Sequence, residues 1–432
     1  MSQVAPWISE ALARRSAGAA APWLDTLRTK ALERFATEGW PSNKLENWRH
    51  TSLAMLEQHS FQQGSTEGLA QAVAQLRNNE PGHWLVFANG QYAPELSDVG
   101  MLPAGVSLCT VAQAMAGHGD LIQMLFGSAE QGSAVQALNT ALAADGAFLK
   151  LNRGVVLEQT VHLVFVTSGA AAVNAVRNLL HAEAGSHATV VEHFIGNNSQ
   201  AGFTTTVTQI NLEADARVTH MKLQREDEQA FHFGALNVQQ DKASVFNSHS
   251  MSFGARLARN DIATTFNDHH CETLLNGLYY VNGKRHVDHH TVIGHNSPHG
   301  ISREYYRGIL DDQARGVFAG RILVAPGADK TDAVQRSDSL LLSRLARSDA
   351  RPELEIYADD VKCAHGATVG QISDDSLFYL RSRGLDEQHA RNVLTYAFAA
   401  ESIQRIESPS LRARVVQAIG KLAPHGLTGD HE

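Results

Sequence analysis

Cysteine is scarce in this chain. Its 432 residues include only three, Cys109, Cys271 and Cys363, which lie far apart in the sequence. An odd number of scattered thiols does not suggest a disulfide framework and fits a reducing compartment. Three thiols also fall short of the four that a self-contained iron–sulfur site usually needs. We therefore expect a cytoplasmic protein without structural disulfides.

Long apolar runs and an excess of basic charge are lacking as well. No run approaches the ~20 apolar residues that span a bilayer, and the N-terminal residues lack the pattern of a secretory signal. The formal net charge of −9 argues against a nucleic-acid partner, which usually requires a basic face. With 43% apolar and 19% charged residues, the chain can still bury a large core.

Common catalytic motifs are also missing from the sequence. There is no GxxxxGK[ST] loop for nucleotide phosphates, no GxSxG nucleophile elbow and no GxGxxG after a strand. We therefore expect that this chain does not bind and hydrolyse ATP through a P-loop, and none of these motifs points to an enzyme.

The N-terminal third has the periodicity of helices. Apolar residues recur at helical spacing around Trp7 and through residues 23–35, and residues 134–144 have helical composition. One β-favouring run, His83–Ala88, precedes an Asn-Gly pair, which is a strong signal for a hairpin turn. We predict a mostly helical domain with a small hairpin over residues 1–145.

Short β-rich runs take over from residue 146 to residue 372. A polar turn leading into Ala-x-Val or a near variant precedes Val190, Val218 and Val245, which are 28 and 27 residues apart. A similar turn precedes Val317, 72 residues further on. Such a period suits a β-solenoid, whose coils bury one another's faces. The pattern alone fits a large β-sandwich equally well.

The stretch Leu354–Glu401 begins with an extended run, followed by a turn that Gly366 and Gly370 would allow. In an extended backbone, side chains two residues apart share a face, so Cys363 and His365 would point the same way. A thiol beside an imidazole can hold iron, copper or zinc. Two ligands are too few for a stable tetrahedral site, so the residues alone favour a small buried thiol and a satisfied polar histidine.

A helical domain is predicted over residues 373–432. Acidic residues at Asp374 begin a short helix that Gly384 ends, and Asp386 can cap the next helix. An apolar stripe is expected on that second helix at Ala390, Val393, Leu394, Ala397 and Phe398. One interpretation of these helices is a cap over the last coil of a solenoid.

Two stretches resemble the SufB/SufD family of the SUF iron–sulfur cluster assembly system. The first is LEIYADDVKCAHGATVG followed by FYLRSRG and YAFAAE, and it is long and specific. The second is KLENWRHT at residues 44–51, in which Trp48 would pack a helical lid onto the main body. The resemblance is weaker between residues 100 and 340. Around His365, Val-Lys-Cys-Ala-His-Gly replaces the Val-Glu-His-Glu-like run of SufB-type chains, which favours the SufD type.

The resemblance implies a right-handed parallel β-helix over residues 146–372, between helical domains at both ends. It implies a scaffold subunit that pairs with a SufB-like paralogue through the β-helix and docks a SufC-like ATPase through its C-terminal helices. A homodimer of the isolated chain is left open. The family's histidine at the paired interface corresponds to His365, with Cys363 as a second candidate ligand.

Iron or a cluster would be held transiently and shared with SufB, with no cofactor bound tightly to the chain alone. Whether the assembled complex binds a flavin is left open. An aromatic and arginine-rich run after residue 377 has the composition of an interface. The residues expected to face partners are Phe378, Leu380, Arg381, Arg383, Tyr396, Phe398 and Glu401.

A histidine-rich window offers a rival hypothesis, a β-helical metal-dependent enzyme. Residues 269–299 contain seven histidines, and His286-Val287-Asp288 could supply part of a two-histidine, one-carboxylate iron site. Adjacent pairs such as His289-His290 would face opposite sides of a strand, and no HExxH motif is present. We therefore favour a solvated strand and turn region for this window. The other histidines are His269, His270, His295 and His299.

Overall fold

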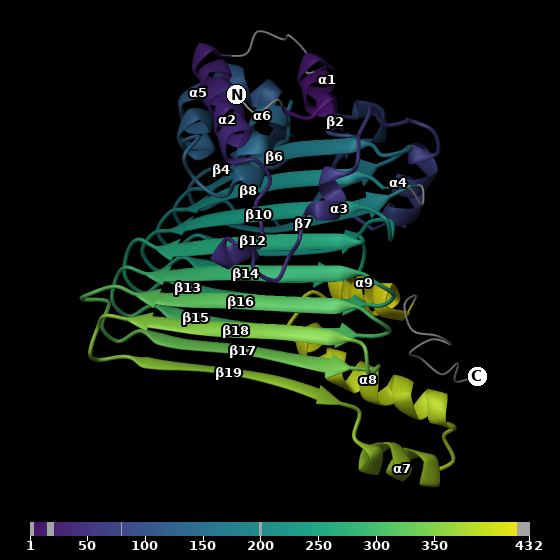
Figure 1. The fold of residues 1–432 in the computed structure, drawn as a ribbon. Helices are drawn as coiled ribbons and strands as arrows, with labels where there is room; N and C mark the ends of the chain where they lie inside the picture. The colour runs from purple at the N-terminus through teal and green to yellow at the C-terminus, as the bar shows by residue number, and fades with distance from the viewer. Residues whose placement is uncertain (1–3, 15–20, 79, 198–200, 421–432) are drawn as a thin grey trace.

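Two parallel β-sheets, between which the chain alternates coil by coil, form the body of the molecule (Figure 1). The computed structural model describes residues 4–14, 21–78, 80–197 and 201–420. The chain forms a strand in one sheet, crosses to the other sheet for the next strand, and then returns. Strands that are hydrogen-bonded neighbours within a sheet are therefore two apart in sequence order, as β17 and β19 are. This arrangement confirms the predicted parallel β-helix with helices at both ends.

Sheet 1 ends in a short antiparallel pair near the N-terminal helices and is otherwise parallel. In spatial order it contains β19 (Lys362–Gln371), β17 (Asp332–Leu341), β15 (Ile301–Leu310), β13 (Glu272–Val281), β11 (Val245–Ser252), β9 (Arg217–Arg225), β7 (His187–Gly196), β5 (Val161–Thr167), β1 (His83–Ala88) and β2 (Gln91–Tyr92).

Sheet 2 is parallel except for the pairing of β3 with β4. In spatial order it contains β18 (Arg347–Ile356), β16 (Arg315–Val324), β14 (His286–His295), β12 (Leu257–Phe266), β10 (Phe231–Gln240), β8 (Phe203–Leu212), β6 (Val173–Ala182), β4 (Ala147–Leu151) and β3 (Val106–Thr110).

One corner of the solenoid repeats in six consecutive coils. A residue with positive φ is followed by a small, buried residue that enters the next strand of sheet 1. The spacing of these corners is 30, 28, 27, 29 and 31 residues, and the positive-φ residues are Gly185, Asp215, Ala243, His270, His299 and Lys330. The polar turns seen in the sequence are therefore the real repeat. Cys271 is one of the small corner residues, so its role is structural.

The valines chosen from the sequence as the repeat are not in register. Val218 pairs with Ala188 and Phe246, whereas Val190 pairs with His220. Val317 lies in β16, which belongs to the other sheet. The corner sets the register of each strand, and the coils differ in length. Valines at similar spacing in the sequence are therefore not register partners in neighbouring strands.

Most N-terminal helices cover the first coils and the outer face of sheet 2 (Figure 1), whereas the helix Leu69–Arg77 packs against the outer face of sheet 1. The expected stripes are found in the first two helices, the hairpin lies where it was predicted, and residues 134–144 are helical over Ala134–Leu142. The elements are α1 (Pro6–Arg14), α2 (Pro22–Glu38), η1 (Glu46–Trp48), α3 (Ala54–Glu57), α4 (Leu69–Arg77), η2 (Pro94–Leu96), α5 (Val111–Phe126) and α6 (Ala134–Leu142).

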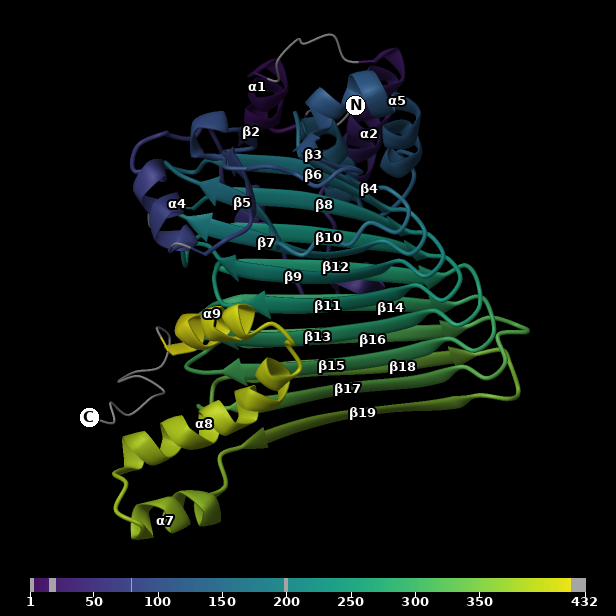
Figure 2. The same cartoon turned by 180° about the vertical axis from the view of Figure 1, so that it is seen from behind.

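The C-terminal helices are α7 (Asp374–Ser382), α8 (Glu387–Gln404) and α9 (Pro409–Gly420). Asp386 caps α8 as predicted, and Gly384 after α7 has a φ of +98°. Figure 2 shows α8 and α9 on the outer face of sheet 1. There Ile403 and Val415 pack on outward-facing apolar residues such as Met221.

The interpretation of these helices as an end cap is therefore wrong. The outer face of β7 to β15 is apolar and requires cover, and the helices bury that face instead of the last coil. The predicted stripe on α8 is also rotated: Val393 is 43% exposed, while Asn392 and Thr395 are buried. These polar side chains are satisfied along the helix: Gln388 donates to Asn392 Oδ1 at 3.0 Å, and Thr395 Oγ1 donates to the carbonyl of Arg391 at 2.8 Å.

In the part of the chain that the structure describes, no helix has both the length and the apolar character needed to cross a membrane.

Candidate functional site at the open end of the solenoid

The last coil leaves the solenoid open. Among the described residues, β18 pairs only with β16 and β19 only with β17, so both are edge strands with unpaired backbone groups. Every described residue of β19 is exposed or half-buried, and Val369, an apolar residue on its inward-facing side, is 51% exposed. A long edge of this kind is a template for pairing with another chain.

Cys363 and His365 lie on β19 and share one face, as the sequence predicted. Cys363 is in register with Ala333 of β17, and His365 with Gln335. Both partners are buried in the interior, so the two side chains continue inward-facing columns on the uncovered coil. The predicted turn at Gly366 and Gly370 is wrong, because β19 runs through both residues.

The two candidate ligands differ in exposure. Cys363 is half-buried and packs against the main hydrophobic core, whereas His365 is exposed. Burial raises the pKa of the Cys363 thiol, and the nearby Asp332 raises it further. Because the thiolate is the form that binds metal, Cys363 is a poorer ligand in the isolated chain than an accessible imidazole.

Among the described residues, no three or more His, Cys, Asp or Glu side chains are grouped so that they could hold a metal ion. The pair on β19 thus offers one accessible imidazole and one protonated thiol. A half-site of this kind leaves coordination positions that ligands from elsewhere would have to fill.

The column that ends at His365 is polar inside the solenoid. Glu304 of β15, Gln335 of β17 and His365 are consecutive register partners. Glu304 and Gln335 are 0% and 1% exposed, and Gln335 Nε2 donates to Glu304 Oε2 at 2.6 Å. Burial raises the pKa of Glu304 to about 7. The sequence analysis missed both Glu304 and Gln335. Alternation along a strand shows which residues share a face, but it does not show which of the two faces is buried.

The expected partner-facing residues separate into two groups. On α7, Phe378 is 74% exposed, and Arg381 and Arg383 are also exposed, whereas Leu380 is half-buried. Arg383 lies over the ring of Tyr379, 5.2 Å from its centroid. This end of α7 is an exposed aromatic and cationic surface.

The second group, on α8, is directed at the solenoid. Phe398 and Glu401 both contact Arg307 of β15, and Tyr396 packs against the cluster under the helices. Tyr396 and Phe398 are half-buried, and Glu401 remains exposed apart from its ion pair. These three residues therefore hold α8 in place.

The histidine-rich window is not the solvated region that the sequence suggested. Asp288, His289 and His295 are completely buried. Two strands and two corners make up this window, and only the corner histidines, His270 and His299, are exposed. The strand alternation was predicted correctly. His289 contacts two interior tyrosines, whereas His290 faces outward and pairs with the carboxylate of Asp288.

The carboxylate of Asp288 is fully engaged by the protein. Its Oδ2 atom accepts from Thr51 Oγ1 at 2.5 Å and from Arg259 Nη1 at 2.7 Å, and His290 Nε2 lies 3.0 Å from Oδ1. Burial opposes ionisation of Asp288, but Arg259 and His290 outweigh it and hold the pKa of the carboxyl well below its usual range. Because Arg259 and Thr51 already occupy Oδ2, the geometry favours a structural ion pair over an iron site.

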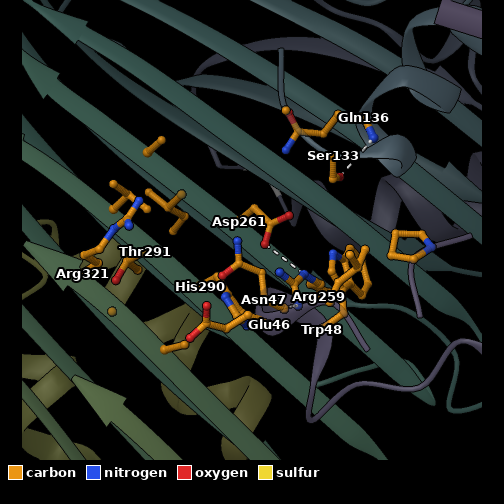
Figure 3. Close-up of a pocket in the computed structure, with 18 of the residues that line it drawn as sticks. Glu46, Asn47, Trp48, Ser133, Gln136, Arg259, Asp261, His290, Thr291 and Arg321 are labelled. Atoms are coloured by element: carbon orange, nitrogen blue, oxygen red, sulfur yellow. Dashed lines mark hydrogen bonds and ion pairs between the residues drawn. The ribbon is translucent and has the colours of Figure 1, made fainter. Parts of the chain in front are cut away.

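A groove of about 1330 Å³ lies between the segment around Trp48 and the outer face of sheet 2 (Figure 3). Arg259 lies over the ring of Trp48, 3.8 Å from its centroid, and its Nε donates to Asp261 at 2.9 Å. Trp48 itself is 4% exposed, which confirms the predicted lid. The cations in Figure 3 are paired: Arg259 with Asp261, and Arg321 with a neighbouring glutamate.

Comparison with known proteins decides the family. The model for "SUF system FeS cluster assembly, SufBD core domain" matches residues 165–398, and the model for "SufBD protein N-terminal region" matches residues 12–163. The chain belongs to the SufBD family. It is 34% identical to the iron–sulfur cluster assembly protein SufD of Escherichia coli, over 91% of this chain and 92% of that protein.

Other members of the SufBD family match over a similar length. An iron–sulfur cluster assembly SufBD family protein of Synechocystis is 32% identical, covering 88% of this chain and 86% of its own. The SufD protein of Bacillus subtilis is 27% identical, covering 92% and 93%. The resemblance first noted on two short stretches therefore extends over the whole solenoid.

Proposed function

We propose that this SufBD-family chain is a non-catalytic, cytoplasmic scaffold subunit of an iron–sulfur cluster assembly complex. Its last coil would pair with the corresponding coil of a SufB-like paralogue. The observation that carries the proposal is an uncovered coil, with edge strands in both sheets, on which His365 stands exposed. A partner that continues both sheets would bury the edge and supply the ligands that the half-site lacks.

His365 would meet iron or a nascent cluster at that junction, with Cys363 as the weaker ligand. A cluster held by only one or two side chains from each subunit is released more readily than one held by four from a single chain. This lability suits a site that builds clusters for transfer. The cargo is shared, so the isolated chain is expected to hold little iron.

The exposed end of α7 is the proposed contact for a SufC-like ATPase. Phe378 and Tyr379 are 74% and 56% exposed, and Arg381 and Arg383 add cationic groups that can pair with an acidic partner surface. Since α8 is tied to Arg307 of β15, a force on α7 would reach the solenoid close to its open end. ATP-driven movement of the partner could thereby bias the pairing of the two scaffold chains.

The test is co-purification with the SufB-like and SufC-like partners, followed by reconstitution and assay of iron and acid-labile sulfide. Replacement of His365 by Ala should leave the complex intact and lower its cluster content several-fold. Lys362→Ala provides a control on the same strand, because Lys362 is exposed and lies on the side of β19 opposite to His365. Equal cluster content in the wild-type and His365→Ala complexes would contradict the assembly role of His365.

Docking through α7 is tested separately. Phe378→Ala combined with Arg381→Ala should abolish co-purification of the ATPase while the pairing with the SufB-like chain persists. Gln404→Ala, at the solvent-exposed C-terminal end of α8, is the control. Retention of the ATPase by the α7 variant would place its docking surface elsewhere.

A further inference from the structure

Glu304 differs from the other deeply buried carboxylates of the solenoid. Glu192 lies 3.4 Å from His220, Glu226 lies 2.8 Å from His232, and Asp288 is paired with an arginine. No ion pair of Glu304 is found among the described residues; its polar neighbours are the amide of Gln335, which donates to it, and the hydroxyl of Thr291. A buried carboxyl group without a cation costs stability and suggests a use beyond packing.

The hydrogen bond to Glu304 fixes how the Gln335 amide is oriented. When Glu304 is ionised its oxygens only accept, so the NH₂ group of Gln335 faces it, and in the structure Nε2 is the donor at 2.6 Å. The amide oxygen Oε1 of Gln335 is buried and has no partner among the described residues. An unsatisfied buried acceptor is unfavourable by an amount comparable to a lost hydrogen bond.

The opposite sheet leaves space for this amide. Gly320 of β16 faces it, and a Cβ atom on Gly320 would lie only 2.3 Å from Gln335 Nε2. Any larger residue at position 320 would displace the amide from Glu304. The position of the Gln335 side chain is therefore determined from two sides, by a carboxyl group and by a glycine.

The next residue of the column, on the same inward-facing side, is His365. Strand neighbours in register are separated by about 4.8 Å, which is within reach of an imidazole N–H and a glutamine oxygen. We propose that Gln335 is a positioning residue for His365: its Oε1 accepts an N–H from the imidazole, and Glu304 holds the amide in the orientation that presents this oxygen. One ring nitrogen of His365 then donates inward, and the other is left free to bind metal at the junction.

This inference rests on the proposed role of His365, but its structural part can be tested without a partner. The full-length chain is labelled with ¹⁵N-histidine, and the imidazole of His365 is assigned as the resonance lost in His365→Ala. In the wild type, one neutral tautomer should predominate. Gln335→Met, which keeps the length of the side chain but removes the acceptor, should reduce that preference by about two- to tenfold, the effect of one hydrogen bond.

Two further variants distinguish positioning from packing. Ser337→Ala is the matched control, because Ser337 is the next inward-facing residue of β17 and pairs with Ala367 instead of His365. It should leave the tautomer ratio unchanged. Glu304→Gln is nearly isosteric and allows the Gln335 amide to bind in either orientation, so it should weaken the preference in part. It decides the case if Gln335→Met does not fold.

Identical tautomer ratios in the wild type, Gln335→Met and Glu304→Gln would overturn the inference. The assembled complex tests whether this positioning matters for the proposed function. There, Gln335→Met should lower iron retention without loss of the partner subunits. If the tautomer ratio changes but His365→Ala still builds cluster, the positioning stands and the assembly role of His365 fails. The two claims can thus be rejected independently.

Discussion

The guanidinium of Arg307 lies over the ring of Phe398, 4.6 Å from its centroid. Arg307 belongs to β15, near the open end of the solenoid, and Phe398 belongs to α8. The same guanidinium donates to the carbonyl oxygen of Phe398 at 2.8 Å and forms an ion pair with Glu401. One largely buried side chain thus connects the last coils to the helices that continue into the exposed surface of α7.

Arg307→Ala should loosen these helices without unfolding the solenoid. The loss of a cation–π contact and two charge-assisted hydrogen bonds is expected to cost about 1–3 kcal/mol locally. Limited proteolysis should show faster cleavage between β19 and α8. Arg303→Ala is the control, since Arg303 on the same strand pairs with Asp332 at a side-chain exposure of 32%. Equal cleavage of both variants would contradict the anchoring role.

Asp288→Asn should be strongly destabilising. The buried carboxylate accepts from Thr51 and Arg259 and pairs with His290, and removing its charge leaves Arg259 without its closest partner. Breaking a buried ion pair of this kind costs about 3–5 kcal/mol. Urea unfolding measures the change. Asp261→Asn removes the other acidic partner of Arg259, which is 25% exposed, and should cost less than about 1 kcal/mol.

His295 should make the protein sensitive to mild acid. Burial lowers the pKa of His295 to about 4, below the value of ~6.5 in an unfolded chain. Because the unfolded state then binds the proton more readily, the contribution of His295 to stability is complete above pH ~6.5 and is lost as the pH falls toward 4. His295→Gln should therefore flatten the dependence of the unfolding free energy on pH in this range.

The expected size of this effect is about 1.4 kcal/mol per pH unit for one proton. Urea unfolding between about pH 4.5 and pH 7.5 measures it, and the glutamine can keep a hydrogen bond to Ser302, which lies 2.9 Å from Nε2 in the wild type. His270→Gln at an exposed corner should leave the slope as in the wild type. An unchanged slope in His295→Gln would show that other groups govern the acid response.

Gly308→Ala and Gly366→Ala should differ sharply although both glycines lie in strands of sheet 1. A Cβ atom on Gly308 would lie 2.2 Å from the ring of Tyr279, which is fully buried, whereas none of the surrounding atoms is within 4 Å at Gly366. Overpacking of the core is expected to cost about 1–3 kcal/mol at position 308. Chemical denaturation compares the two, and similar midpoints would show that the interior yields easily around Tyr279.

Much of the local structure was accessible from the sequence. The Asn-Gly pair after Ala88, the cap at Asp386 and the shared face of Cys363 and His365 are all properties of a few neighbouring residues. The polar corner turns recur in six consecutive coils, so the solenoid period could be detected as well. Turn chemistry and strand alternation are local, which is why these predictions held.

The errors concern burial and register between distant segments. The sequence could not show that Asp288 lies under Thr51 and beside Arg259, because both partners come from other parts of the chain. It also could not show that α8 covers the side of the solenoid instead of its end. The column from Glu304 to His365 exists only because three coils are in register. The sequence by itself determined the repeating coil and the ligands placed on its last strand. Only the tertiary structure decided which faces are covered, because coverage depends on apolar and polar surfaces that meet after the chain has coiled.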